Sequence, residues 1–206
     1  ILVVDDHVLL RKGIRSILEK LRIVDLVVEA SDGFEAIEET RKQRFDLVLL
    51  DISMPNKDGL DTLKQLKYEF PKVKVLMLSM YPEENYAIRV LKAGAAGYLE
   101  KDCRPEQLEK AIRDVMTQGK YVSPTVVLAL AETIDSTSKA SSQDQLSDRE
   151  IQVMRLLASA RTINEIAGQL KISAKTVTTY KARILEKLHL KNTAELIRYA
   201  LENKIC

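Results

Sequence analysis

The sequence predicts a five-stranded, doubly wound parallel α/β domain that is linked to a small all-α domain. Short apolar runs rich in β-branched residues alternate with longer amphipathic stretches over about the first 120 residues, which is typical of a parallel sheet covered on both faces. A polar stretch rich in Ser and Gln follows, and the remaining residues show only helical periodicity. A chain of 206 residues is long enough for two domains.

The α/β part is predicted from five strand and helix pairs. The strand-like runs are residues 1–4, 24–30, 46–50, 73–78 and 97–99. The helical patterns are residues 7–20, 33–42, 59–69, 82–93 and 105–118. Five such pairs are too few for an eight-stranded barrel and predict an open sheet instead.

The second part contains four helical patterns and no strand-like run. The patterns cover residues 148–158, 163–170, 174–188 and 193–202. The stretch 135–145 has no periodicity and is predicted to be a flexible linker. We therefore expect a first domain over residues 1–120, a helix plus linker over 121–146, and a second domain over 147–206.

Composition and charge exclude several classes of protein. A hydrophobic content of 46% and a charged content of 30% exclude wholesale disorder. The net charge of +2 excludes a uniformly basic nucleic-acid coat. Residues 147–206, however, carry 11 basic and 6 acidic side chains, and this local excess predicts an anionic partner for the second domain.

Membrane insertion and a disulfide framework are also not expected. The longest apolar runs are far shorter than the roughly 20 residues that a membrane span needs. The two cysteines, Cys103 and Cys206, are too few for a disulfide framework or a zinc site. These features favour the reducing cytoplasm. The chain does not begin with Met, and we expect that a few residues are missing from its start.

Three carboxylates are predicted to converge at one rim of the sheet. In an open parallel sheet, ligands bind beyond the carboxyl ends of the strands. The first predicted strand is followed by Asp5 and Asp6, and the third by Asp51. Hard oxygen ligands of this kind suit Mg²⁺ together with phosphate oxygens. A carboxylate in such a site is a competent nucleophile for a phosphoryl group.

The fourth and fifth strands add two polar side chains to the same rim. Lys101 could supply a point charge to one phosphoryl oxygen, and the Ser79 hydroxyl a hydrogen bond to another. Each residue also has an ordinary structural interpretation. Asp6 could cap the next helix, Lys101 could be a solvated charge, and Ser79 could be a turn residue. The placement of all of them at one rim favours the phosphoryl site.

These residues resemble the receiver domain of bacterial two-component response regulators. The matching motifs are Val-Val-Asp-Asp at 3–6, Leu-Asp-Ile-Ser-Met-Pro-Asn-Lys-Asp-Gly at 50–59, Ser79, and Gly-Tyr-Leu-Glu-Lys at 97–101. The resemblance covers about 118 residues and implies a flavodoxin-like fold.

The resemblance also implies a role for each residue of the rim. Asp51 would be the phosphoacceptor. Mg²⁺ would be bound by Asp6, Asp51 and the main-chain carbonyl of Ser53, with Asp5 acting mainly through water. Ser79 and Tyr98 would form a switch pair, in which the hydroxyl moves toward the phosphate and the ring turns inward. From spacing alone, Tyr98 is better explained as a core or surface aromatic residue.

The second domain shows a helix-turn-helix pattern. Ser147 and Glu150 fit a capping box at the start of its first helix. The next helix, a tight turn at 171–173 and a longer helix each have one apolar face. An ordinary helical hairpin would show the same pattern, but residues 171–191 carry six basic side chains and one acidic one. A basic second helix is what a reader of the DNA major groove needs.

The second domain resembles the LuxR-type DNA-binding domain of the NarL/FixJ response regulators. The resemblance rests on Leu-Ser-Asp-Arg-Glu-Ile-Gln-Val-Met-Arg-Leu-Leu-Ala at 146–158, Glu-Ile-Ala at 165–167 and Ile-Ser-Ala-Lys-Thr-Val at 172–177. It implies that exposed early positions of the second helix read bases. Those positions are Thr178, Thr179 and Ala182, with Lys175, Thr176, Lys181 and Arg183 placed to reach phosphates or nearby bases. Some relatives carry Lys at positions 178 and 182, so the target sequence stays open.

Together these features predict a transcription factor controlled by phosphorylation, and not an enzyme with turnover. A sensor histidine kinase would phosphorylate Asp51, and the modified protein would form a homodimer on double-stranded promoter DNA, with RNA polymerase as a further candidate partner. The segment 193–202 is our candidate dimer helix, although it could equally pack inside its own bundle. His7 and His189 are assigned no role.

Two other interpretations remain open at this point. An aspartyl-phosphate phosphohydrolase would also use Asp51 and Mg²⁺, but such enzymes generally have a second carboxylate where this chain has Ser53. A transcription factor with a vestigial receiver, which acts without phosphorylation, is less compatible with the complete acidic set.

Overall fold

The chain folds into two compact units, Ile1–Asp135 and Ser136–Cys206. The computed structural model describes residues 1–21, 24–54, 56–80, 82–128, 146–170 and 172–203. The linker predicted at 135–145 lies outside the described residues. No helix in the described part of the chain is long and apolar enough to cross a membrane.

The first unit contains a parallel sheet of five strands. These are β1 (Leu2–Val4), β2 (Val28–Ala30), β3 (Leu47–Asp51), β4 (Lys74–Ser79) and β5 (Gly97–Glu100). Their order in the sheet is β2-β1-β3-β4-β5, and every neighbouring pair is parallel. The strand order reverses between β1 and β3, which therefore form the switch point where doubly wound sheets bind ligands.

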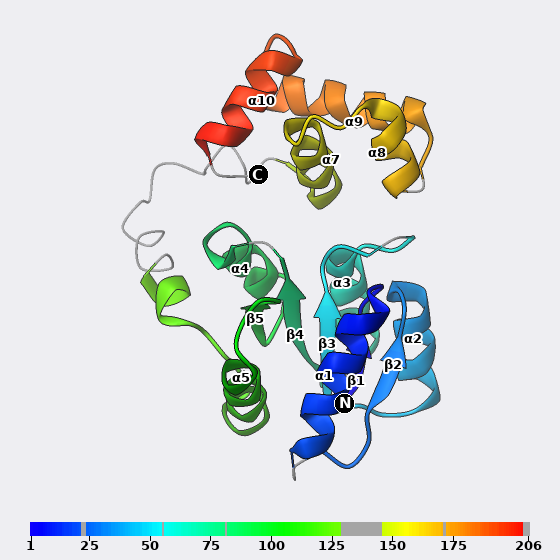
Figure 1. Cartoon of the computed structure of the whole chain (residues 1–206), viewed down its shortest axis with the longest axis vertical. Helices are drawn as coiled ribbons and strands as arrows, with labels where there is room; N and C mark the ends of the chain where they lie inside the picture. Colours follow the sequence, from blue (N-terminus) through cyan, green and yellow to red (C-terminus); the bar gives the residue numbers. More distant parts are fainter. Residues whose placement is uncertain (22–23, 55, 81, 129–145, 171, 204–206) are drawn as a thin grey trace. The chain divides into compact units, whose positions relative to one another are not determined.

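Five helices cover the two faces of this sheet (Figure 1). They are α1 (Val8–Lys20), α2 (Gly33–Lys42), α3 (Gly59–Glu69), α4 (Glu83–Lys92) and α5 (Pro105–Gln118). Ile14 and Leu18 of α1 and Ile112 of α5 lie in one buried cluster with alternate residues of the strands. The other three helices contact β1, β2, β3 and β5. The predicted fold class is confirmed.

The second strand is shorter than the sequence predicts. The prediction covers residues 24–30, but only Val28–Ala30 pairs with β1. Within residues 24–27, Val27 is buried, but Asp25 is exposed and Leu26 is 55% exposed. An apolar run alone does not show where hydrogen bonding to the neighbouring strand begins, so this boundary was wrong.

The second unit contains four described helices. They are α7 (Asp148–Ala158), α8 (Ile163–Leu170), α9 (Ala174–Lys187) and α10 (Thr193–Glu202). The predicted capping box is present, because Ser147 and Glu150 bond each other's backbone N–H groups. Glu150 also accepts a 2.7 Å ion pair from Lys187, which ties α7 to α9. These contacts make Glu150 a structural residue, as the sequence suggested.

Candidate functional site

The three predicted carboxylates meet at the switch point of the sheet. Asp5 and Asp6 follow β1, and Asp51 is the last residue of the adjacent β3. Each offers an oxygen atom to a group whose members all lie within 4.8 Å of one another. Asp5 and Asp51 are each 1% exposed. Carboxylates this close and this buried repel each other unless a cation or proton lies between them.

Lys101 supplies one such cation from the end of β5. Its Nζ lies 2.7 Å from Asp5 Oδ2 and 2.7 Å from Asp51 Oδ2, and its side chain is 4% exposed. Its backbone N–H donates to the carbonyl of Ser79, which fixes the loop to the end of β4. Burial alone would lower the pKa of the Lys101 ammonium, but the charges of Asp51 and Asp5 outweigh it and raise that pKa. Lys101 is therefore held protonated within the site.

Asp51 is a carboxylate in an unfavourable environment. Burial raises its pKa, and the charge of Asp5 adds to the rise, although Lys101 opposes it. The backbone N–H of Ser53 donates a 3.1 Å hydrogen bond to Asp51 Oδ1. A carboxylate whose negative charge is destabilised in this way gains from a bound cation or from losing its charge in an ester or anhydride.

The two residues of the predicted switch pair lie on the neighbouring strands. Ser79 ends β4 and is 1% exposed, and the register pairs the residue before it with Asp51. Tyr98 lies on β5, opposite Met77 of β4, and is 3% exposed. The structure therefore places both residues in buried positions on β4 and β5, and the Tyr98 ring is inside the fold.

Gly59 fixes the position of Asp51 from behind. Its N–H donates to the carbonyl of Ile52 at 2.9 Å. A Cβ atom at Gly59 would lie 1.9 Å from the carbonyl oxygen of Asp51. Only glycine allows α3 to begin this close to the end of β3, and this constraint was not predicted from the sequence. No residue pattern signals this role, because it depends on the distance between two backbone segments.

His7 joins the acidic cluster, which the sequence analysis did not predict. Its Nδ1 lies 2.9 Å from Asp6 Oδ1 and 3.3 Å from Asp5 Oδ1. Its own backbone N–H donates to Asp5 Oδ1 at 2.8 Å. The signal in the sequence was its position directly after Asp5 and Asp6, at the end of a strand.

The residues present fit a divalent cation. In the described part of the chain, Asp5 Oδ2, Asp6 Oδ1 and Asp51 Oδ2 are buried and accept no well-directed hydrogen bond. Lys101 Nζ forms ion pairs with two of these oxygens, Asp5 Oδ2 and Asp51 Oδ2, at 2.7 Å each. Three carboxylates that share one ammonium group still carry excess negative charge, which suits a hard cation such as Mg²⁺. The acidic pocket is thus compatible with Mg²⁺.

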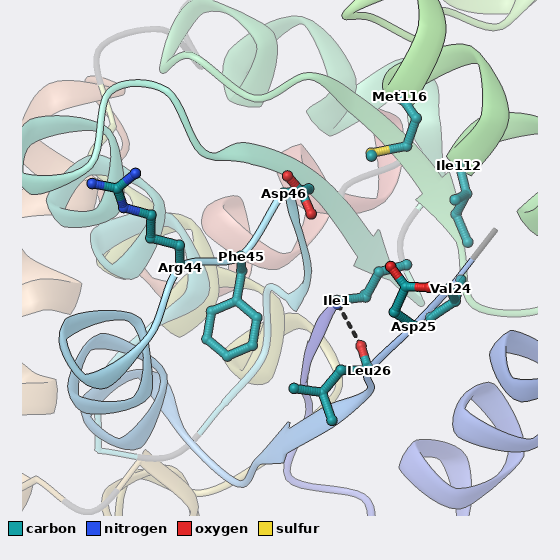
Figure 2. Close-up of a pocket in the computed structure, with 9 residues that line it drawn as sticks. All are labelled: Ile1, Val24, Asp25, Leu26, Arg44, Phe45, Asp46, Ile112 and Met116. Atoms are coloured by element: carbon teal, nitrogen blue, oxygen red, sulfur yellow. Dashed lines mark hydrogen bonds between the residues drawn. The ribbon is translucent and has the colours of Figure 1, made fainter.

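Two cavities of the first unit contain none of the predicted site residues. One, of about 120 Å³, is lined by residues that include Ile1, Leu26 and Met116, and the Ile1 amine donates a 2.7 Å hydrogen bond to the carbonyl of Leu26 (Figure 2). The other, of about 820 Å³, lies beside it and shares residues 44–46. Both adjoin the amino ends of strands, whereas the acidic cluster lies at their carboxyl ends.

The second helix of the helix-turn-helix pattern has one buried and one open face. Val177 and Ile184 of α9 are buried, and Ser173 caps the helix by accepting from the N–H of Thr176. Five of the predicted DNA-contacting residues are exposed, and two are half-buried. The exposed ones are Lys175, Thr178, Thr179, Ala182 and Arg183, and the half-buried ones are Thr176 and Lys181.

The hydroxyl groups of two threonines on this face already donate within α9. Thr178 Oγ1 donates to the carbonyl of Ala174 at 3.0 Å, and Thr179 Oγ1 donates to the carbonyl of Lys175 at 3.0 Å. Their free lone pairs can still accept hydrogen bonds, and their methyl groups can make apolar contacts. Toward DNA, such a face offers acceptors and methyl groups at its centre.

The last helix uses one face for its own bundle. Leu196 and Ala200 are buried, and α10 contacts α7. The face predicted for dimerisation is more open, because Ala194 is exposed, Ile197 is half-buried and Leu201 is 59% exposed. Packing within the bundle therefore leaves a second apolar strip on the same helix available.

Two protein families match the two units. Residues 1–113 match the family described as response regulator receiver domain, and residues 144–200 match the bacterial regulatory proteins of the luxR family. The chain belongs to the NarL/FixJ response regulators.

Curated relatives match over the whole chain. Response regulator UvrY of Escherichia coli (strain K12) is 36% identical over 207 residues, which cover 100% of this chain and 95% of UvrY. Response regulator GacA of Pseudomonas aeruginosa is 35% identical, with 98% of this chain and 95% of GacA covered.

Solved structures of response regulators are also similar. The Salmonella typhimurium RcsB response regulator is 30% identical, with a TM-score of 0.69 and coverage of 96% of this chain and 94% of RcsB. RcsB from Salmonella enterica serovar Typhimurium, bound to the promoter rprA with the phosphomimetic BeF₃⁻, is 29% identical, with a TM-score of 0.66 and coverage of 96% of each chain.

This response regulator has a receiver that takes its signal from a kinase and a luxR-family unit that binds DNA and regulates transcription. Its receiver brings together the three predicted carboxylates and Lys101, with Ser79 on the adjacent strand end. The residues that sequence reasoning missed are His7 and Gly59, because neither has a chemical role that spacing alone reveals.

Proposed function

We propose that Asp51 of this response regulator accepts a phosphoryl group from the histidine of a sensor kinase. The observation that carries the proposal is the burial of Asp51 at 1% exposure, with Lys101 Nζ 2.7 Å from its Oδ2 and two more carboxylates beside it. Phosphorylation replaces the charge of the buried carboxylate by the charge of the phosphoryl oxygens. These oxygens lie farther from the sheet, where cations can reach them.

The other residues of the site have distinct roles in this proposal. Asp6, Asp51 and the carbonyl of Ser53 hold Mg²⁺, and Asp5 acts mainly through water. The ion, when bound, neutralises the incoming phosphoryl oxygens. Lys101 contacts one phosphoryl oxygen as a point charge. The position of Ser53 supports a switch rather than an enzyme with steady turnover, because it is where phosphohydrolases generally carry a second carboxylate.

Ser79 and Tyr98 pass the change to the surface of the receiver. The Ser79 hydroxyl turns toward the phosphoryl group, and the buried Tyr98 ring turns inward beside β4 and β5. This movement biases the surface around the last strands and helices toward a homodimer. The proposed bounds are 1–120 for the receiver, 121–146 for the helix plus linker, and 147–206 for the DNA-binding domain.

DNA is bound through the open face of α9. Its exposed basic residues meet phosphates, and the two threonines meet bases as acceptors or through their methyl groups. Two linked domains on neighbouring half-sites gain affinity through avidity, with the open strip of α10 as their contact. Since promoter DNA and RNA polymerase are its proposed partners, we place the protein in the cytoplasm.

The test uses beryllofluoride as a mimic of the phosphoryl group. Sedimentation and DNA binding are measured on the full chain with Mg²⁺ alone and with Mg²⁺ plus beryllofluoride. We expect the mimic to produce dimers and to tighten DNA binding. Asp51→Asn should show neither change. A wild-type protein that ignores the mimic in both assays would contradict the proposal and favour a receiver that works without phosphorylation.

A further inference from the structure

The open face of α9 carries only short side chains at its centre. Thr178, Thr179 and Ala182 are all exposed there. Ala182 is four residues after Thr178 and three after Thr179, so the three side chains share one side of the helix. Lys175 lies one turn before them and is also exposed. Because no long side chain stands at this centre, the helix can come close to the base edges in a major groove about 12 Å wide.

The hydroxyl hydrogens at this centre are already used within the helix. Thr178 Oγ1 donates to the carbonyl of Ala174, and Thr179 Oγ1 donates to the carbonyl of Lys175, at 3.0 Å each. A threonine hydroxyl has one hydrogen to donate, and an alanine side chain has none. These three side chains therefore present oxygen lone pairs and methyl groups to a groove, and no hydrogen-bond donor.

The thymine methyl group is what such a surface can distinguish. In the major groove, A·T and G·C pairs each present two acceptors and one amino donor, and an A·T pair adds the C5 methyl of thymine. Without donors, the centre of the face cannot pair with the acceptors. Its lone pairs can accept from the amino group of adenine or of cytosine, so they do not separate the two pairs by themselves. The methyl groups of the two threonines and of Ala182 can make an apolar contact that only thymine offers.

We propose that each target half-site has A·T pairs opposite Thr178, Thr179 and Ala182, and that these residues recognise them through the methyl groups of thymine. The charged neighbours Lys175 and Arg183 then supply affinity by contacting phosphates. The inference rests on the proposed docking of α9 in the major groove. It adds which base pair the helix reads and by which chemical group.

The test begins with a DNA site that the full chain selects from random duplexes in the presence of Mg²⁺. Selection is run with and without beryllofluoride, so that a receiver that ignores the mimic still yields a site. Each thymine of the selected site is then replaced in turn by deoxyuridine, which lacks only the methyl group. We expect binding to weaken about three- to fivefold at one or more positions of each half-site, as for one buried methyl group. At the same positions, 5-methylcytosine should bind more tightly than cytosine.

Two substitutions at each threonine separate the methyl group from the hydroxyl group. Thr178→Ser removes the methyl group and keeps the hydroxyl, and Thr178→Val keeps the methyl group and removes the hydroxyl. Thr179 is changed in the same two ways. Each serine variant should bind the thymine site about three- to fivefold more weakly and should not distinguish thymine from deoxyuridine at the position it contacts. Each valine variant should keep the preference for thymine.

Thr117→Ser on α5 is the matched control. Thr117 is exposed, and its hydroxyl donates to the carbonyl of Arg113 at 2.7 Å, as the two threonines of α9 do to theirs. It lies in the receiver unit, so this variant should bind DNA like the wild type. Equal binding shows that exchanging threonine for serine on a helix surface does not by itself weaken DNA binding.

Several results would overturn the inference. One is a selected half-site without thymine at its centre, or a selection that yields no preferred sequence. Another is equal binding of the thymine and deoxyuridine sites by the wild type. Serine variants that still distinguish thymine from deoxyuridine, or valine variants that do not, would overturn it as well.

A failure of the proposed docking of α9 gives a different pattern. In that case Lys175→Ala binds DNA like the wild type, and so do the serine and valine variants. If Lys175→Ala weakens binding to all DNA while deoxyuridine has no effect, α9 lies on the DNA and only the readout of thymine is wrong.

Discussion

Gly59→Ala is expected to damage both the stability and the phosphoryl uptake of the receiver. The added Cβ would lie 1.9 Å from the carbonyl oxygen of Asp51, where real Cβ contacts do not fall below 3.0 Å. The start of α3 and the end of β3 must therefore separate by about 1 Å. Because backbone atoms form the contact, no side chain can yield. Overpacking of this kind costs about 1–3 kcal/mol in free energy of unfolding.

Displacement of Asp51 adds a functional effect to this loss. Misplacing a reacting group by about 1 Å can cost on the order of 100-fold in rate. Acetyl phosphate uptake by Gly59→Ala should therefore slow well beyond what its unfolded fraction explains. Urea unfolding, followed by circular dichroism on the same samples, measures the loss in free energy of unfolding.

Gly13→Ala is the matched control in the same unit. Gly13 lies within α1, and a Cβ there would meet nothing within 4 Å. This variant should gain about 0.5–1 kcal/mol, because alanine favours a helix interior over glycine. Gly59→Ala with wild-type stability and uptake, alongside a stabilised Gly13→Ala, would show that β3 and α3 are not held by this contact.

Three further substitutions address charge. Asp51→Asn should raise the melting temperature in EDTA, because burial raises the pKa of Asp51 and its ionised form costs stability at neutral pH. A melting temperature equal to or below that of the wild type would contradict this. Glu150→Gln should lose about 1–3 kcal/mol at pH 7. Burial opposes the change, but the bonds from Lys187 and Ser147 lower the pKa of Glu150 below 4.5. The difference in free energy of unfolding between the variant and the wild type should therefore persist above pH 4.5 and vanish as the pH falls through the lowered pKa. Urea unfolding at several pH values measures it. Lys175→Ala should reduce the salt slope of DNA binding by about one unit, whereas Lys110→Ala on α5 should not; a sequence-selective loss would make Lys175 a base reader.

Much of the fold was predictable because the alternation of apolar strands with amphipathic helices, and the periodicity of those helices, are direct consequences of burial. The strand before Asp5 and the strand that ends at Asp51 are continuous apolar runs, since both faces of β1 and β3 are covered. The convergence of Asp5 and Asp51 then follows from parallel pairing. The start of β2 was not predictable, because Leu26 is apolar and yet 55% exposed.

The site was predictable where chemistry depends on residue type, and less so where it depends on shape. Lys101 was identified because a lysine at a strand end can reach the same rim as the carboxylates. The missed role of Gly59 depends on a distance between two backbones, which no residue pattern encodes. The contact of His7 with Asp6 was missed because the residue pattern does not show toward which neighbour the imidazole turns.

The ammonium group of Lys101 affects how the receiver folds. Held between Asp5 and Asp51, it acts as a tethered counter-ion that comes with the polypeptide. The unit can therefore complete its folding before any ion arrives, unlike small domains that stay unfolded until metal binds. A dissolved cation must compete with Lys101 for the carboxylates. Its binding free energy is therefore the difference between its own interaction with them and that of Lys101. We expect such an affinity to be moderate, so that an ion can enter and leave while the scaffold stays intact.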